Sequence, residues 1–222
     1  YNINIKNAAA WAQAVFKFNK VEFFVAGQFS RSDFQRVGHV RSGLFPNESF
    51  GDSKKNEFNN YGAKAGVTYK INGRNYIYAR GAYLTRPPYF ESVYTSPRTR
   101  HTQQADVTSE EIQTAEAGYV LNAPMLKVRV SGYYTHFANG MDVMSFYHDT
   151  YQNFVNYAIN GIDKLHFGGE FGLEAKVAPG LSLNAAAAIG RYYFDSKQNA
   201  TITADNTTNI LGQQIVYAEN FR

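Results

Sequence analysis

Apolar and polar residues alternate over long stretches of this chain, most clearly from Asp163 to Phe194. In its first half the odd positions 165–177 are apolar or glycine, whereas charged residues such as Glu170 and Lys176 fall between them. The alternation resumes after Pro179-Gly180, and a period of two on both sides of a tight turn predicts an antiparallel β-hairpin with one apolar face. Strands of soluble domains usually run about 5–6 residues, but a tilted strand that crosses a bilayer needs about 9–11. These strands therefore have the length that a membrane requires.

The same alternation predicts three further hairpins earlier in the chain. They cover roughly residues 8–30, 61–85 and 111–135, with turns at Asn19-Lys20, Asn72-Gly73 and Asn122-Ala123-Pro124. The Asn-Gly pair is the strongest of these turn signals, because it tolerates the positive φ angles of a type I′ turn. The pattern as a whole predicts about eight long antiparallel strands.

The connections at the opposite ends of these strands are all long. They cover roughly residues 36–56, 86–109, 138–160 and 195–209, and within the third the segments MDVMSFY and QNFVNYAI predict a hairpin that extends beyond a membrane. Short turns that alternate with long loops are typical of outer-membrane barrels, which have short periplasmic turns and long extracellular loops. The fold class expected is therefore all-β, an antiparallel up-and-down transmembrane β-barrel segment. A β-sandwich or soluble β-solenoid is the alternative, although the two ends of a sandwich usually carry comparable loops.

Aromatic residues gather near both ends of the predicted strands. Near the short turns lie Phe16, Phe18, Phe23, Tyr69, Tyr76, Tyr78 and Tyr119, and near the far ends lie Phe29, Tyr61, Tyr83, Tyr134, Tyr193 and Phe194. Two such rows are expected where amphipathic rings sit at the depth of the lipid headgroups.

Composition excludes several classes of protein. No apolar run approaches the roughly 18–20 residues of a transmembrane helix, but this leaves a barrel open, because alternation dilutes the hydropathy signal. Cysteine is absent, so the chain has no disulfide framework and no thiolate metal site. The net charge is +4, yet lysine and arginine form no stripe, so we expect no nucleic acid partner.

Both ends of the chain look cut. It opens without an initiator methionine and closes on QQIVYAENFR, part-way through what resembles another strand. We therefore expect residues 1–222 to be part of one β-barrel domain that is incomplete at both ends. An isolated piece of such a sheet has open edges and an apolar surface, through which we expect it to associate.

Three stretches resemble the β-barrel of TonB-dependent outer-membrane receptors: Tyr76–Tyr94, Ser109–Asp142 and Val216–Arg222. In that family a strand ending in Arg-x-Pro precedes a long loop. A Glu-x-Gly-Tyr strand then leads through a short turn to a basic, aromatic strand that ends near an aspartate. Here Arg86, Pro88, Glu116, Gly118, Tyr119 and Asp142 hold these places. The resemblance extends over nearly the whole chain and about a third of a 22-stranded barrel.

This resemblance implies energised uptake of a scarce ligand, such as an iron chelate, a cobalamin or a glycan, across the bacterial cell outer membrane. The implied partners are TonB, the plug domain of the same full-length chain, which has no counterpart in these residues, and outer-membrane lipid. Catalytic residues, cofactors and metal sites are not expected, because the five histidines lack metal-ligand spacing. Two alternatives are a complete small outer-membrane barrel with an adhesin or structural role and a soluble β-rich binding module.

Two sets of residues are candidates for the transport path. A charge that faces lipid costs about 2–4 kcal/mol at mid-bilayer, so the charged strand residues should face the lumen: Glu116, Lys127, Arg129, Glu170, Glu174 and Lys176. On such strands, charge pairing is a better interpretation of the glutamates than acid/base catalysis. The loops near Arg86–Tyr94 and Met141–Tyr151 should contact the ligand through Arg86, Tyr89, Tyr94, Asp142, His148 and Tyr151.

Overall fold

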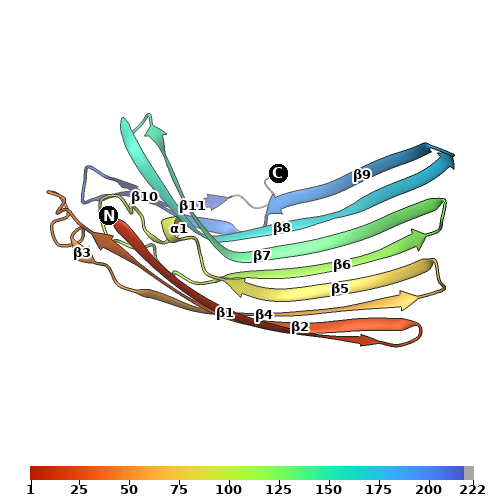
Figure 1. Ribbon diagram of the computed structural model, residues 1–222. Coiled ribbons are helices and arrows are strands. Elements are labelled where there is room, and N and C mark those ends of the chain that lie inside the picture. The colour runs from red at the N-terminus through yellow and green to blue at the C-terminus, as the bar shows by residue number, and fades with distance from the viewer. Residues whose placement is uncertain (218–222) are drawn as a thin grey trace.

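The computed structural model describes residues 1–217, which form one antiparallel sheet of 11 strands. Eight strands are long: β1 (Asn2–Lys17), β2 (Val21–Gly38), β4 (Asn56–Lys70), β5 (Asn75–Arg86), β6 (Glu110–Asn122), β7 (Leu126–His148), β8 (Asn153–Ala178) and β9 (Leu181–Phe194). Three are short: β3 (Gly51–Asp52), β10 (Lys197–Ala204) and β11 (Ile210–Tyr217). The sheet is strongly curved and open (Figure 1). Because residues 1–217 hold one continuous sheet, the β-sandwich alternative is wrong.

The four predicted hairpins are all present, and their short turns lie together at one end of the sheet (Figure 1). In the β4–β5 turn the Asn72 side-chain oxygen accepts hydrogen bonds from the backbone N–H groups of Arg74 and Asn75, at 2.9 and 3.0 Å. In the β8–β9 turn Gly180 adopts a φ of +80°, which other residues rarely reach. The turn residues read from the sequence therefore close these hairpins for local reasons.

The opposite end of the sheet contains one strand, β10, that the alternation does not predict. β7 and β8 continue as a paired ribbon to His148 and Asn153, which confirms the hairpin expected there. The expected loop over residues 195–209 is wrong, because it contains β10, which pairs with the N-terminal half of β8. Its alternating residues Ala200 and Ile202 are only 2% and 3% exposed, so burial against β8 holds as a strand a segment whose threonines and asparagines favour loops.

The register divides the long strands into two faces. Antiparallel partners point to the same side of a sheet, and the pairs Glu116↔Tyr133, Lys127↔Glu174 and Ser131↔Glu170 place all six predicted lumen residues on one face, which we call the polar face. The opposite, apolar face carries exposed side chains that include Val25, Phe29, Tyr61, Val67, Ile77, Val130, Tyr134, Phe171, Leu183 and Ile189. An apolar surface of this extent is a lipid-facing or interaction surface. Tyr76, Tyr78 and Phe194, assigned above to an aromatic girdle, instead lie on the polar face.

Aromatic rings on the polar face lie over glycines of the neighbouring strand. Phe24 is paired with Gly66, Tyr78 with Gly118 and Tyr133 with Gly168. A Cβ atom built on Gly118 would lie 2.7 Å from the Tyr78 ring, and one on Gly66 would lie 2.5 Å from the Phe24 ring. Glycine at these strand positions leaves room for each ring to lie across the next strand, and a larger residue there would push the ring aside.

β8 serves two different partners along its length. Its C-terminal part, from Lys164 onward, pairs with β9, and its N-terminal part, from Val155 to Asn160, pairs with β10. Between them Gly161 has a φ of +67°. The Ser196 hydroxyl donates to the Gly161 carbonyl at 2.7 Å and accepts from the Asp163 N–H at 2.9 Å, which fixes the point where the chain passes from β9 to β10.

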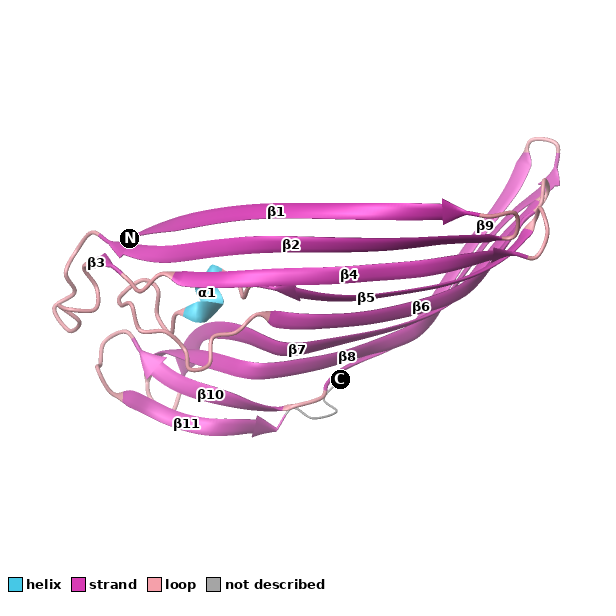
Figure 2. Cartoon of the chain, turned by 90° about the horizontal axis from the view of Figure 1, so that it is seen from below, coloured by secondary structure: helices cyan, strands magenta, loops and turns pink. Residues whose placement is uncertain are grey.

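The connection between β5 and β6, residues 87–109, folds back against the sheet. It contains the one-turn helix α1 (Phe90–Val93), which is cyan in Figure 2 and lies at the loop end of the sheet. Phe90 and Tyr94 pack there on Phe34 of β2 and Phe58 of β4, with the Phe34 ring centroid 5.2 Å from that of Phe58 and 5.7 Å from that of Phe90. This hydrophobic cluster gives the loop end its own core. Within residues 1–217 no helix has the length and apolar character to cross a membrane.

The ring-over-glycine arrangement predicts unequal effects of two glycine substitutions. Gly118→Ala should displace Tyr78 and cost about 1–3 kcal/mol of unfolding free energy, as overpacking does. Gly172→Ala is the control, because Gly172 also lies on the polar face and a Cβ there meets nothing within 4 Å. Urea unfolding in detergent measures both, and equal destabilisation of the two variants would contradict the steric argument.

The two faces can be tested with adjacent alanines of β9. Ala187 pairs with Phe171 on the apolar face, and Ala188 pairs with Glu170 on the polar face. Ala187→Lys should cost about 2–4 kcal/mol in the membrane, whereas Ala188→Lys places its ammonium opposite a carboxylate and should be tolerated. The amount of folded protein recovered from outer membranes measures the difference, and similar yields would count against the assignment of faces.

Candidate functional site

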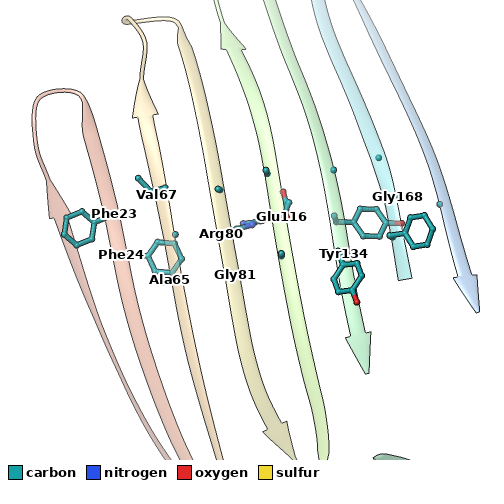
Figure 3. A pocket seen from close by; sticks show the side chains of 18 of the residues that line it. Phe23, Phe24, Ala65, Val67, Arg80, Gly81, Glu116, Tyr134 and Gly168 are labelled. Carbon is teal, nitrogen blue, oxygen red and sulfur yellow. Dashed lines mark hydrogen bonds and ion pairs between the residues drawn. The ribbon is translucent and has the colours of Figure 1, made fainter. Parts of the chain in front are cut away.

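A charged network joins three neighbouring strands at the middle of the polar face. Glu116 of β6 accepts hydrogen bonds from the Tyr78 hydroxyl at 2.6 Å, from Arg80 Nε at 2.9 Å and from Arg129 at 3.1 Å. Arg129 also donates to the Tyr78 oxygen at 3.0 Å. Figure 3 shows Arg80 and Glu116 pointing toward each other from β5 and β6. Two of the predicted lumen residues, Glu116 and Arg129, thus belong to one network, to which Arg80 and Tyr78 also contribute.

The other four predicted lumen residues lie nearer the turns or farther along the sheet. Lys127 of β7 forms an ion pair with Glu174 of β8 at 3.1 Å. Glu170 and Lys176 lie on the same face, and neither makes an ion pair within 4 Å among residues 1–217. The register therefore brings all six onto one surface, while their role in lining a lumen stays a prediction.

A broad, open hollow of about 1050 Å³ lies on the sheet at the level of the charged network. Its lining includes Phe24, Arg80 and Glu116 of the polar face, but most of its residues, among them Val67 and Tyr134, belong to the apolar face (Figure 3). The hollow is therefore mainly an apolar surface, with the charged network around Glu116 at its border.

At the loop end, one buried arginine joins both long connections. Arg36, near the end of β2, is 2% exposed and pairs with no carboxylate among residues 1–217. Its guanidinium donates to the carbonyl of Ser49 at 3.2 Å, to the carbonyl of Pro97 at 2.6 Å and to Nδ1 of His101 at 2.9 Å. Ser49 lies in the connection 39–55, and Pro97 and His101 lie in the connection 87–109. A charge buried in this way is stabilised by fixed carbonyl dipoles, which hold the two loops together.

His101 is held as a neutral imidazole by the same contacts. Its Nδ1 accepts from Arg36, and its Nε2 lies 3.4 Å from the Phe50 carbonyl, to which it donates in the matching tautomer. Burial, together with the nearby Arg36 charge, lowers the pKa of His101 below its ordinary value. A second proton on Nδ1 would remove the acceptor that Arg36 uses.

Three of the predicted ligand-binding residues lie at the start of the connection 87–109, in different surroundings. Tyr89 is 70% exposed, and Arg86, which is ion-paired with Glu110, has its guanidinium carbon 5.5 Å from the centre of the Tyr89 ring. Tyr94 is fully buried in the loop core, and its hydroxyl lies 2.9 Å from the Ser53 hydroxyl. Arg86 and Tyr89 are thus accessible in this structure, whereas Tyr94 supports the loop.

The other three lie on the β7–β8 hairpin. The rings of His148 and Tyr151 are 4.8 Å apart, and the Tyr151 hydroxyl donates to the Leu211 carbonyl at 3.3 Å. The Asp142 carbonyl accepts from the Gln104 side chain at 3.2 Å, which links this hairpin to the connection 87–109. Ligand contact by all six residues stays a prediction. In the described part of the chain, no group of three or more His, Cys, Asp or Glu residues is placed to hold a metal ion.

Acidification should loosen the two loops around His101. Because its folded pKa lies below the ordinary 6.5, the unfolded loops bind a proton at a higher pH than the folded loops. Loop stability should therefore be complete above about pH 6.5 and should fall as the pH drops through that value toward the lower folded pKa. Hydrogen-exchange protection of residues 39–55 and 87–109 at pH 7.5 and 5 measures this.

Two histidine variants make the pH test specific. His101→Gln should remove the loss of protection at low pH, because a glutamine side chain takes up no proton. His39→Gln should retain it, because His39 is exposed and makes no contact with Arg36. An unchanged pH response in His101→Gln would rule out His101 as its source.

Comparison with known proteins agrees with this architecture. The family profile described as "TonB dependent receptor-like, beta-barrel" matches residues 1–220. Among solved structures, the copper transporter OprC is similar in fold, with a TM-score of 0.70 at 14% sequence identity; the similarity covers 89% of this chain and 32% of OprC, so this chain spans about a third of that structure's length. No curated protein matches the chain. Because the family profile extends over almost the whole chain, this protein belongs to the β-barrel family of TonB-dependent receptors.

Proposed function

We propose that residues 1–222 form part of the wall of a TonB-dependent transporter in the bacterial outer membrane. It takes up a scarce ligand, such as an iron chelate, a cobalamin or a glycan, and performs no bond chemistry. The transport role is proposed from the family match, and the similarity to OprC at 14% identity supports the fold alone, so its copper ligand is not carried over. TonB and the plug domain of the full-length receptor are the partners that this role requires.

The observation that carries the proposal is the asymmetry between the two ends of the sheet. One end has only short turns, whereas the other has long connections with their own core around Phe34 and Tyr94. A transporter needs such a structured outer end, because ligand capture from dilute solution requires pre-organised loops. The apolar face then lies against lipid, and the polar face lines the lumen.

Within this proposal the two sets of predicted residues have separate roles. Arg86 and Tyr89 on one connection, and the β7–β8 hairpin with His148 and Tyr151, contact the ligand at the outer end. The network around Glu116 offers successive weak polar contacts along the wall.

Uptake by intact cells tests the proposal. Cells that carry the full-length receptor should accumulate at least one of three labelled probes, a ferric siderophore, cobalamin or an oligosaccharide, and a deletion of TonB should abolish this accumulation. Accumulation that persists without TonB, or no accumulation of any probe, would refute energised transport of this ligand class. Recovery of the receptor in the soluble fraction would contradict the membrane location.

A loop variant tests where the ligand binds. Arg86→Ala combined with Tyr89→Ala and Tyr151→Ala removes exposed side chains and should reduce uptake about tenfold or more, since a few aromatic and arginine residues carry most binding energy. Tyr94 is left intact, because it is a core residue whose loss would unfold the loop. Arg74→Ala, in the turn at the opposite end, is the control and should transport normally. Equal uptake by the triple variant would exclude these residues from ligand capture.

A further inference from the structure

A second cavity, of about 540 Å³, lies among the loops at the outer end of the chain. Three segments far apart in the sequence line it: residues 44–48, residues 95–105 and the hairpin of β10 and β11. It shares no lining residue with the hollow over the charged network, so it is a separate site. We call it the Arg100 cavity, after the one arginine in its lining.

Several polar groups of this lining are buried without a hydrogen-bond partner in the described residues. Arg100 is 4% exposed, and its Nε and Nη2 atoms have none. The Gln103 side-chain nitrogen and the Thr203 hydroxyl are in the same state. Buried polar groups are almost always hydrogen-bonded, because each unpaired group costs free energy. Four atoms that can donate, from three residues of one cavity, therefore point to a ligand that accepts hydrogen bonds.

The Arg100 guanidinium is oriented by stacking rather than by an ion pair. Its central carbon lies 4.5 Å from the centre of the Phe45 ring, and Phe45 is itself buried. Stacking fixes the plane of the guanidinium and leaves its in-plane N–H groups available. Nε and Nη2 are the pair of nitrogens on one side of an arginine that can bind both oxygens of a carboxylate or phosphate.

The nearby carboxylates of the chain are engaged elsewhere. Glu48 accepts a hydrogen bond from the Thr102 hydroxyl at 2.9 Å. Asp205 accepts from Ser96 and Asn156 and is ion-paired with Arg98. Neither carboxylate comes within 4 Å of the Arg100 nitrogens. Their charges offset part of the buried positive charge at longer range, but they leave its hydrogen-bonding edge free.

We propose that the Arg100 cavity binds an oxyanion group, a carboxylate or a phosphate, of a small acidic ligand. This inference rests on the proposed function, in which the outer loops capture a transported solute, and it narrows the solute to an anionic class. Arg100 supplies a bidentate contact, and Gln103 and Thr203 donate to the remaining oxygens. A cavity of about 540 Å³ has the size of a small-molecule site.

Calorimetric titration of the full-length receptor in detergent tests the inference. The probes are tricarballylate as a carboxylate, inorganic phosphate, and glycerol as a neutral polar control, all at constant ionic strength. One of the two oxyanions should bind and raise the unfolding temperature, and the one that does so identifies the group. Glycerol should do neither.

Variants separate a ligand-binding role from a structural role. Arg100→Met keeps the length of the side chain but removes its donors, and should weaken oxyanion binding about tenfold or more. It should leave the unfolding temperature of the ligand-free receptor unchanged or higher, because it removes a buried charge without a paired partner. Arg41→Met is the matched control, since Arg41 lies in the connection 39–55, is exposed and does not line the cavity. Thr203→Val should give a smaller loss of binding.

Two results would overturn the inference: no binding of either oxyanion, or equal binding by Arg100→Met. If no oxyanion binds and Arg100→Met also lowers the unfolding temperature, Arg100 is a structural residue. TonB-dependent uptake is measured in the same cells. Uptake of a probe without oxyanion binding would refute the inference and leave the proposed function intact, whereas oxyanion binding without any uptake would refute transport alone.

Discussion

The fold depends on the pairing of every strand backbone with a neighbour. In a bilayer, unpaired N–H and C=O groups cost several kcal/mol each, so the ladder must continue from strand to strand. Once the ladder is set, the side-chain period of two decides which residues meet. The network of Glu116, Arg80 and Arg129 exists because the register places these side chains on one face of three adjacent strands. A slip of one residue in all three strands would move these side chains to the opposite, apolar face.

The long strands could be predicted because their signals are local. Alternation and turn residues such as Asn72-Gly73 specify each hairpin without reference to the rest of the chain. That Glu116 and Arg129 share one face was expected from the cost of placing charge in lipid, and the register confirms the shared face. β10 was missed because its residues favour loops, and only packing on β8 holds it as a strand. Tyr78 lies near the short turns, as a girdle residue would, but it has the same parity as Arg80 along β5, and this parity places it on the polar face.

The loop end could not be predicted from local sequence in the same way. Arg36 bonds to residues 61 and 65 positions away, so nothing near it in the chain indicates that it is buried. Arg100 likewise obtains its surroundings from three separate segments. In the long strands, the face that a residue occupies follows from whether its position is odd or even. In the loops, the burial of a residue depends on how two connections and the β10–β11 hairpin pack together. The burial of Arg36 and Arg100 therefore could not be predicted from the residues next to them in the sequence.

The division of β8 between two partners makes this strand a fork in the sheet. After Gly161, the edge of β8 that faces away from β7 pairs with β9, which is part of the wall. Before Gly161 the same edge pairs with β10, which lines the Arg100 cavity. The two hydrogen bonds of the Ser196 hydroxyl, to the backbone of Gly161 and Asp163, hold together the point where β9 and β10 separate. One strand therefore belongs both to the wall and to the support of the Arg100 cavity, so the position of the cavity relative to the wall is set by the backbone pairing of β8.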